Sequence, residues 1–398
     1  MRLISLGDLN KKLIYPLIGA ICKLIANFVL DFGDEYFDFA LDNHPFIIAI
    51  NTSFGMSLTI IPYLYIRKYS RIAEKESLNN NKYLDQFFKK RDPVVKRKKY
   101  LILFLCSFLD FTQKILAFLF SFKLKTNLWM FNVVIINVFT SMITQNKLYR
   151  HQYFSSGIMI LFGILLNIIN LNDMQLKDVP MLILNILIEI IYSLCIVLAK
   201  YGMDDLFCSP YEITFYEGIF ALILNIIFLI ILTNIPIPSE KVWFFFKFLK
   251  VSEYDKEYYL DNFYSYINQM NFIEILLFIL HMLARASFNL FSHITIKYYT
   301  ASHVILILIL GEIFVSFIEK NTGDILIKLG ISIVELIMVL VFCEIIELNF
   351  CDLEKNTRKN IQERAKLSIY DEEEEGRESK IVIEGLELNS EENSTIND

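Results

Sequence analysis

The chain has 398 residues, of which 55% are hydrophobic, with 35 Phe and 21 Tyr, and its mean hydropathy is +0.45. A soluble chain of this length cannot bury that much apolar surface in a core. Charged residues make up 21% and are confined to loops and a tail, which is typical of a polytopic membrane protein. The net charge of −6 comes largely from the acidic tail. The six cysteines show neither disulfide-framework nor metal-site spacing, so we expect no metal and no cofactor. Composition argues against a nucleic-acid-binding domain and a disulfide-rich secreted module.

Ten windows of the sequence have the length of a transmembrane helix, which needs roughly 17–25 mostly apolar residues. Phe, Ile and Leu dominate these windows, in runs too long for buried strands. The first window is followed by acidic residues rather than a cleavage site, so we expect it to be retained. The windows are 13–30, 46–66, 100–121, 128–145, 153–171, 180–200, 212–234, 272–294, 302–318 and 325–347. The predicted fold class is an all-α polytopic membrane protein with ten transmembrane helices.

The distribution of Lys and Arg predicts which side of the membrane each loop faces, because cytoplasmic loops carry an excess of both. With a cytoplasmic N-terminus (1–12), 26 of the 38 Lys and Arg lie on the cytoplasmic side, and loop 67–99 alone holds 12. An even number of spans then places the tail, 348–398, in the cytoplasm as well. The tail turns acidic after Asp371 and has few aromatic residues, which predicts disorder toward its end.

Loop lengths divide the chain into two similar halves of five spans each, 13–171 and 180–347. In each half the one long loop lies between the second and third spans, at 67–99 and 235–271, and the third and fourth spans are joined tightly. An odd number of spans per half gives the halves opposite orientations. The pattern predicts two inverted five-helix repeats, which typically bind substrate near the bilayer midplane at their interface. Chance similarity of loop lengths is the alternative.

The eighth window carries a polar stripe on an otherwise apolar helix. His281, Arg285, Asn289 and His293 recur every four residues and so share one slowly drifting helical face. An ionised side chain at membrane depth costs about 2.5–3.5 kcal/mol on insertion scales, so it usually faces a cavity or a partner. Arg285 has the geometry to hold a phosphate or carboxylate as a fork. The stripe predicts a substrate-facing wall; the alternative is that it joins helices, with Arg285 paired to an acid.

Other ionisable residues within the windows are further candidates. Asp110 and Lys114 are candidates for substrate contact, although their spacing also allows an ion pair within one helix. Lys23 is deep enough to face a cavity, or it snorkels to the interface. Candidates for a counter-ion of Arg285 or for a proton site are Glu189, Glu217, Glu312 and Glu335. The last two lie mid-span, whereas Glu217 lies near the start of a span, where an interfacial position is the simpler interpretation.

Recognisable catalytic and nucleotide-hydrolysing motifs are missing from the sequence. It contains no glycine-rich phosphate loop followed by Lys-Ser/Thr, no His-Glu-x-x-His zinc motif and no Gly-x-Ser-x-Gly nucleophile elbow. We therefore expect the protein not to be an enzyme, and any transport to be secondary or facilitated.

Short motifs in four windows are shared with a known family. They are Asp110 with Thr112, the segment 128–141 followed by 147–151, the segment 209–218, and Phe288-Asn289 through Thr295, Lys297 and Ala301. In these segments the chain resembles the drug/metabolite transporter superfamily, specifically the F branch of solute carrier family 35, which is nucleotide-sugar-transporter-like and EamA-type. The resemblance spans 13 to about 347 and implies a ten-helix endomembrane transporter. Asn132 and Val304 stand where relatives tend to carry arginine. If those arginines contact substrate in relatives, the substrate differs here.

The predicted function is a secondary transporter or antiporter of a small polar, anionic metabolite, nucleotide-sugar-like or related, that works by alternating access. The alternative is a non-transporting membrane scaffold or receptor with the same fold, which the absence of a continuous polar cavity between the halves would favour; a membrane enzyme ranks third. Predicted partners are membrane lipids and a small-molecule substrate, with no nucleic acid. The sequence leaves undecided whether the chain forms a homodimer. The predicted location is an endomembrane (Golgi, endoplasmic reticulum or lysosome-like), with the plasma membrane as the alternative.

Overall fold

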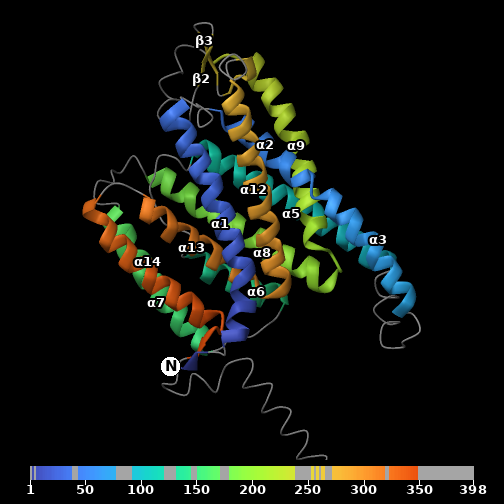
Figure 1. Cartoon of the computed structure of the whole chain (residues 1–398), viewed down its shortest axis with the longest axis vertical. Helices are drawn as coiled ribbons and strands as arrows, with labels where there is room; N and C mark the ends of the chain where they lie inside the picture. Colours follow the sequence, from blue (N-terminus) through green and yellow to red (C-terminus); the bar gives the residue numbers. More distant parts are fainter. Residues whose placement is uncertain are drawn as a thin grey trace, which may run out of the picture.

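A computed structural model shows the chain as a bundle of helices (Figure 1). The structure describes residues 2–3, 6–37, 44–77, 92–120, 131–144, 150–170, 179–237, 252–254, 257–259, 261–264, 271–318 and 322–347. Residues 78–91 of the predicted loop 67–99, much of the loop 235–271 and the whole tail 348–398 lie outside the described residues.

Each predicted window falls on a helix. The helices are α1 (Leu6–Phe37), α2 (Pro45–Ser57), α3 (Ile60–Ser77), α5 (Pro93–Phe120), α6 (Phe131–Thr144), α7 (Arg150–Asn170), α8 (Val179–Asp205), α9 (Pro210–Asn234), α12 (Phe272–Tyr298), α13 (Val304–Ile318) and α14 (Thr322–Phe342). Ala301–His303 adds a turn of 3₁₀ helix before α13. The second window differs from the prediction of one continuous span, because the helix breaks at Leu58 and Thr59 between α2 and α3.

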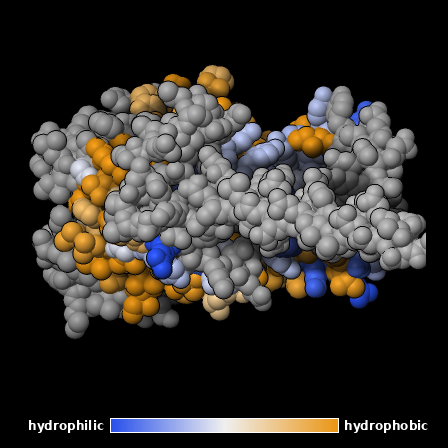
Figure 2. Space-filling view, turned by 90° about the horizontal axis from the view of Figure 1, so that it is seen from below, coloured by the Kyte–Doolittle hydropathy of each residue, from blue (hydrophilic) through white to orange (hydrophobic). Residues whose placement is uncertain are grey.

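Six segments within the described residues are helices long and apolar enough to cross a membrane. They are Leu13–Leu30, Phe46–Lys68, Pro93–Ala117, Leu182–Asp205, Pro210–Asn234 and Phe272–Tyr298. Shorter apolar helical segments lie at Phe131–Ile143, Ala301–Gly311 and Gly330–Phe342. Large apolar side chains such as Ile61, Leu161 and Ile227 are exposed on the helices. In Figure 2, hydrophobic residues (orange) lie mainly at the left and along the lower edge of the view. These features confirm the helical architecture and indicate an integral membrane protein.

Helices that are distant in the sequence make the most extensive contacts in the bundle. The helix α1 packs along α12, and α5 packs along α8. The helix α2 contacts both α9 and α12, and α9 contacts α5. On the other side of the bundle, α13 packs on α1, α6 packs on α8, and α7 packs on α14 (Figure 1). The four helices α2, α5, α9 and α12 therefore form a connected group.

Two short strand pairs lie at opposite ends of the bundle (Figure 1). Strand β1 (Arg2–Leu3) pairs antiparallel with β4 (Ile346–Glu347), so the start of α1 and the end of α14 lie at the same end. Strand β2 (Ser252–Tyr254) pairs with β3 (Glu257–Tyr259) at the other end. Just after β3, Asp261 accepts a hydrogen bond from the backbone N–H of Phe46 at 2.9 Å, which satisfies a free donor at the start of α2.

Local sequence signals explain where α9 and α12 begin. Ser209 accepts from the backbone N–H of Glu212 while the Glu212 carboxylate returns a contact to the Ser209 backbone, and Pro210 occupies the first turn. The pair formed by Asn271 and Glu274 makes the same reciprocal capping box at the start of α12. Such boxes satisfy backbone donors that a helix leaves unpaired at its first turn. They set the register of the two helices that carry most of the polar side chains described next.

Candidate substrate site

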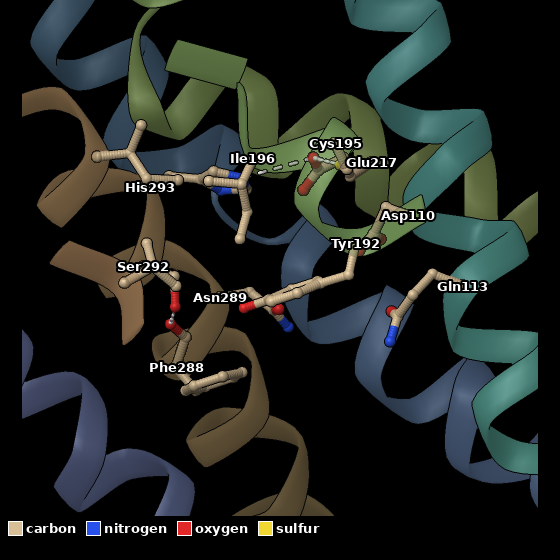
Figure 3. Close-up of a pocket in the computed structure, with 12 residues that line it drawn as sticks. Asp110, Gln113, Tyr192, Cys195, Ile196, Glu217, Phe288, Asn289, Ser292 and His293 are labelled. Atoms are coloured by element: carbon tan, nitrogen blue, oxygen red, sulfur yellow. Dashed lines mark hydrogen bonds and ion pairs between the residues drawn. The ribbon is translucent and has the colours of Figure 1, made fainter. Parts of the chain in front are cut away.

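A small polar cavity lies where α5, α8, α9 and α12 meet (Figure 3). Its volume is about 30 Å³, which holds about two water molecules. Its lining residues are Asp110, Gln113, Tyr192, Cys195, Ile196, Glu217, Phe288, Asn289, Ser292, His293, Ile296 and Val304. Four candidates from the sequence, Asp110, Glu217, Asn289 and His293, therefore meet at one cavity although they come from three helices.

The pair formed by Glu217 and His293 closes one side of the cavity. The imidazole Nε2 lies 3.4 Å from the Glu217 Oε1, and the Nδ1 lies 2.9 Å from the Thr214 hydroxyl. Glu217 is 1% exposed and Thr214 is fully buried. The Cys195 thiol also points at the Glu217 Oε1, at 3.9 Å. Glu217 is therefore buried within the bundle, about two turns after α9 begins at Pro210.

On the other side of the cavity, Asp110 and Lys114 form an ion pair within α5. The Lys114 Nζ lies 2.7 Å from the Asp110 Oδ2, the i to i+4 contact that the sequence spacing allowed. The Lys114 Nζ also lies 3.3 Å from the Met56 sulfur, which in turn accepts from the Asn289 amide at 3.4 Å. Met56 thus links α2 to the polar groups of α5 and α12, one residue before α2 ends. Tyr192 reaches across the cavity toward Asn289 (Figure 3).

The stripe on α12 does not face a single surface. The Asn51 amide of α2 donates to the His281 Nδ1 at 3.1 Å, and the Arg285 Nη2 donates to the Asn27 carbonyl oxygen of α1 at 3.3 Å. His293 instead faces α9. Four residues advance a helix by roughly 400°, so each step of the stripe drifts by roughly 40°. Arg285 therefore lies one turn from Asn289 but does not line the cavity.

A second polar cluster lies around Glu189 on α8. The Asn132 amide of α6 donates to the Glu189 Oε2 at 2.6 Å, and the Ser193 hydroxyl donates to the Asn132 Oδ1 at 3.0 Å. The charge of Lys23 acts on Glu189. The Lys23 stem lies across Gly311 of α13, since a Cβ at Gly311 would be 2.9 Å from the Lys23 Cδ. None of these residues lines the cavity, although Glu189 lies one turn from Tyr192 on α8.

The remaining sequence candidates lie elsewhere. Lys297 donates to the Met203 carbonyl at 2.7 Å, and Lys200 donates to the Tyr299 carbonyl at 2.7 Å, so each lysine holds the end of the other's helix. Glu335 is 1% exposed on α14, away from the cavity-lining residues. Glu312 falls within α13, but its side chain lies outside the described residues.

Three polar residues at the site were not singled out from the sequence: Tyr192, Ser292 and Thr214. Each lies in a long apolar helix, where a single hydroxyl is common as a packing group. Ser292 donates to a carbonyl one turn back in its own helix, which is an ordinary role for such a residue. Only the neighbours supplied by other helices distinguish these residues, and one sequence carries no local signal for them.

No protein-family model matches the sequence, and no curated protein matches it significantly. The similarity to solute carrier family 35 therefore stays a prediction that depends on short motifs.

Proposed function

We propose that the protein is a secondary transporter or antiporter of a small polar, anionic metabolite, built from ten transmembrane helices in two inverted repeats. One observation carries the proposal: ionisable residues from both halves of the chain converge on one buried polar cavity. Asp110 comes from the first half, whereas Glu217 and His293 come from the second. Burying such groups in apolar helices is costly, and residues of this kind mark substrate and ion pathways in membrane proteins. We further propose an endomembrane location, which the resemblance implies, with both termini in the cytoplasm, on the basis of the Lys and Arg distribution.

Helix packing supports the inverted repeat. Let α1, α2–α3, α5, α6 and α7 correspond in order to α8, α9, α12, α13 and α14. The contact of α1 with α12 then corresponds to that of α8 with α5, and α2 with α12 corresponds to α9 with α5. The contact of α1 with α13 corresponds to that of α8 with α6. In the contacts of α2 with α9 and of α7 with α14, each helix meets its own equivalent in the other half. A twofold axis that relates the two halves produces contacts of this kind.

Arg285 supports an anionic substrate. Its guanidinium has five N–H donors. Among the described residues its side chain donates only to the Asn27 amide oxygen, and no acid of those residues pairs with it. The Arg285 side chain is partly exposed, so an anion that arrives with the substrate can reach it and would stabilise a cation that has no acidic partner among the described residues; a phosphate or carboxylate suits the fork geometry.

The cavity is too small for a metabolite, so transport requires the helices around it to separate. The break between α2 and α3 supports such a movement. The Met56 carbonyl at the break accepts from the Thr59 backbone N–H at 3.1 Å and from the Thr59 hydroxyl at 2.7 Å. Interrupted helices beside a binding site are a common element of secondary transporters.

The small volume of the cavity agrees equally with the second candidate function, a membrane scaffold that has the fold of a transporter but does not transport. A scaffold needs no route through the bundle, and about 30 Å³ is no continuous passage between the halves. The two functions differ in ligand binding and in flux, which the next experiment measures.

The test starts from a thermal-shift screen of purified protein with nucleotide sugars, nucleoside monophosphates, inorganic phosphate and dicarboxylates. A ligand at 100 times its Kd stabilises the folded state by about 2.7 kcal/mol. We expect one anionic class to raise the Tm and to enter proteoliposomes. Arg285→Ala should reduce that uptake by about 30-fold or more, because losing one partner of a charged contact costs about 2–5 kcal/mol. Arg150→Ala, at the exposed start of α7, is the matched control and should transport normally. Unchanged uptake by Arg285→Ala removes Arg285 from the mechanism, and no binding of any anion favours the scaffold.

A further inference from the structure

The contacts of Asn51 determine which nitrogen of His281 carries a proton. The Asn51 amide nitrogen lies 3.0 Å from the Phe278 carbonyl oxygen and 3.1 Å from the His281 Nδ1. The carbonyl oxygen only accepts, which fixes the orientation of the Asn51 amide, and an amide nitrogen only donates. The His281 Nδ1 must therefore accept, so it carries no proton. The imidazole is then neutral, and its single N–H is at Nε2.

This N–H and the Asn51 side-chain oxygen are both left without a hydrogen-bond partner. The His281 Nε2 and the Asn51 Oδ1 are buried, and neither has a partner among the described residues. His281 is 0% exposed and Asn51 is 1% exposed, so bulk water does not reach either side chain. A buried polar group without a partner carries its full desolvation penalty, and native proteins leave few of them. One unpaired donor and one unpaired acceptor therefore lie on two side chains that contact each other between α2 and α12.

Arg285 places a positive charge one turn further along α12. Four residues advance a helix by about 6 Å. The charge of Arg285 acts on His281, and its guanidinium donates to the Asn27 oxygen of α1 at 3.3 Å. This is the one hydrogen bond of the Arg285 side chain within the described residues, and the side chain is partly exposed. A cation with further N–H donors thus adjoins the unpaired groups of Asn51 and His281.

We propose that Asn51, His281 and Arg285 form a binding subsite for an anion that also carries a hydroxyl group. The anionic group binds Arg285, and the hydroxyl binds Asn51 and His281. The assignment rests on the proposed transport function and names the substrate class more closely. A hydroxyl both accepts and donates, so its oxygen pairs with the His281 Nε2–H and its proton with the Asn51 Oδ1. An ionised phosphate or carboxylate oxygen only accepts and leaves the Oδ1 unpaired. The subsite therefore selects sugar phosphates and hydroxy acids over anions of the same charge that lack the hydroxyl.

Binding requires α2 and α12 to separate around the subsite. A Cβ at Gly55, one turn after Asn51, would lie 2.8 Å from the Met282 carbonyl oxygen, so the two helices are in direct contact there. Arg285 is partly exposed, whereas His281 is fully buried. The anionic group therefore reaches Arg285 first, and the hydroxyl follows when the helices part. The proposed transport function already requires a movement of this kind.

The protonation of His281 is tested first, without any ligand, by ¹⁵N NMR of histidine-labelled protein in nanodiscs. The His281 signal is assigned by its loss in His281→Gln. We expect a neutral imidazole at pH 7 with its proton on Nε2, because the Asn51 amide donates to Nδ1. A proton on Nδ1, in a neutral or a charged ring, overturns the proposal.

Ligand selectivity is tested by isothermal titration calorimetry with two matched pairs of probes. Glycerol 3-phosphate is compared with n-propyl phosphate, and malate with succinate, since the members of each pair have the same charged groups and differ in hydroxyls. We expect the hydroxylated member of at least one pair to bind at least about fivefold more tightly, because its analogue leaves buried polar groups unpaired. Equal affinities within both pairs, or no binding of any probe, overturn the proposal.

Variants of His281 show whether that preference arises at the subsite. His281→Phe should remove most of the preference and still bind the anion at Arg285. His281→Gln keeps an N–H donor and should retain part of the preference, which also serves as the measurement if His281→Phe does not fold. Asn234→Leu, at the exposed end of α9, is the control and should keep the native preference. A native preference in both His281 variants overturns the proposal.

Uptake into proteoliposomes separates this proposal from the proposed function. Anion uptake without any preference for the hydroxylated probes contradicts the subsite and leaves the transport function standing. A hydroxyl preference in binding without uptake supports the subsite and contradicts transport. Neither binding nor uptake of any probe contradicts both.

Discussion

Gly218→Leu is expected to prevent recovery of a monodisperse protein in mild detergent. A Cβ at Gly218 would lie 2.5 Å from the Ser57 backbone nitrogen and 2.8 Å from the Met56 carbonyl carbon. Backbone atoms at a helix crossing cannot rotate away as the end of a side chain does. The contact of α2 with α9 would therefore open, and the cost should exceed the about 1–3 kcal/mol of ordinary overpacking.

The matched control is Gly157→Ala in α7, where a Cβ meets nothing within 4 Å among the described residues. It should leave the Tm unchanged or raise it slightly, because alanine favours a helix over glycine. Size-exclusion chromatography and a thermal melt measure both variants, with Gly218→Ala expected to fall between them. If Gly218→Leu melts at the native temperature, the close approach of α2 and α9 is wrong.

Asp110→Asn is expected to destabilise the protein more than removal of both charges of its ion pair. The substitution leaves the Lys114 ammonium with the Met56 sulfur as its remaining hydrogen-bond partner among the described residues. Removing one partner of a fully buried ion pair costs about 3–5 kcal/mol. The side chains here are 12% and 20% exposed, so partial solvation should reduce the cost to about 1–3 kcal/mol.

The double variant Asp110→Asn/Lys114→Met should recover most of that loss, because it leaves no uncompensated charge. Thermal melts of the two single variants and the double variant form a double-mutant cycle, and we expect a coupling energy of about 0.5–3 kcal/mol. Additive losses would show that the two charges do not depend on each other. Uptake by the double variant then measures whether the pair also contributes to transport.

The sequence predicted the helices well because the length of an apolar run is a local property. Each window falls on a helix, yet the break at Leu58 and Thr59 was not predicted. The run 46–66 is apolar throughout, but Pro62 lacks a backbone N–H and its ring crowds the carbonyl of Leu58, which favours a break there. The Thr59 hydroxyl donates to the Met56 carbonyl at 2.7 Å, and the Tyr211 carbonyl of α9 lies 3.3 Å from the same hydroxyl oxygen. The prediction from hydropathy alone did not use this proline, which is the local signal for the break.

The candidate site was predicted only in part, because the contacts between helices that form it depend on the assembled fold. The period of four on α12 marks side chains that make contacts with other helices, but it does not show that these contacts diverge toward α1, α2 and α9. Glu217 was a candidate counter-ion or proton site, with an interfacial position as the simpler alternative from its place in the window. Its burial follows from the short connection between α8 and α9 and from its contact with His293, and both depend on the assembled fold.

We propose that the two halves of the chain have opposite orientations in the membrane and meet at the polar cavity. A measurement of membrane topology tests this proposal most directly. Single cysteines replace Val94, Tyr264 and Tyr298, which are exposed near the ends of the described helices, in a chain without its native cysteines. A membrane-impermeant maleimide is then applied to sealed and to permeabilised microsomes. We expect Val94→Cys and Tyr298→Cys to react from the cytoplasmic side, and Tyr264→Cys to react only from the side of the membrane opposite the cytoplasm. Labelling of Val94→Cys and Tyr264→Cys from the same side would contradict the inverted arrangement.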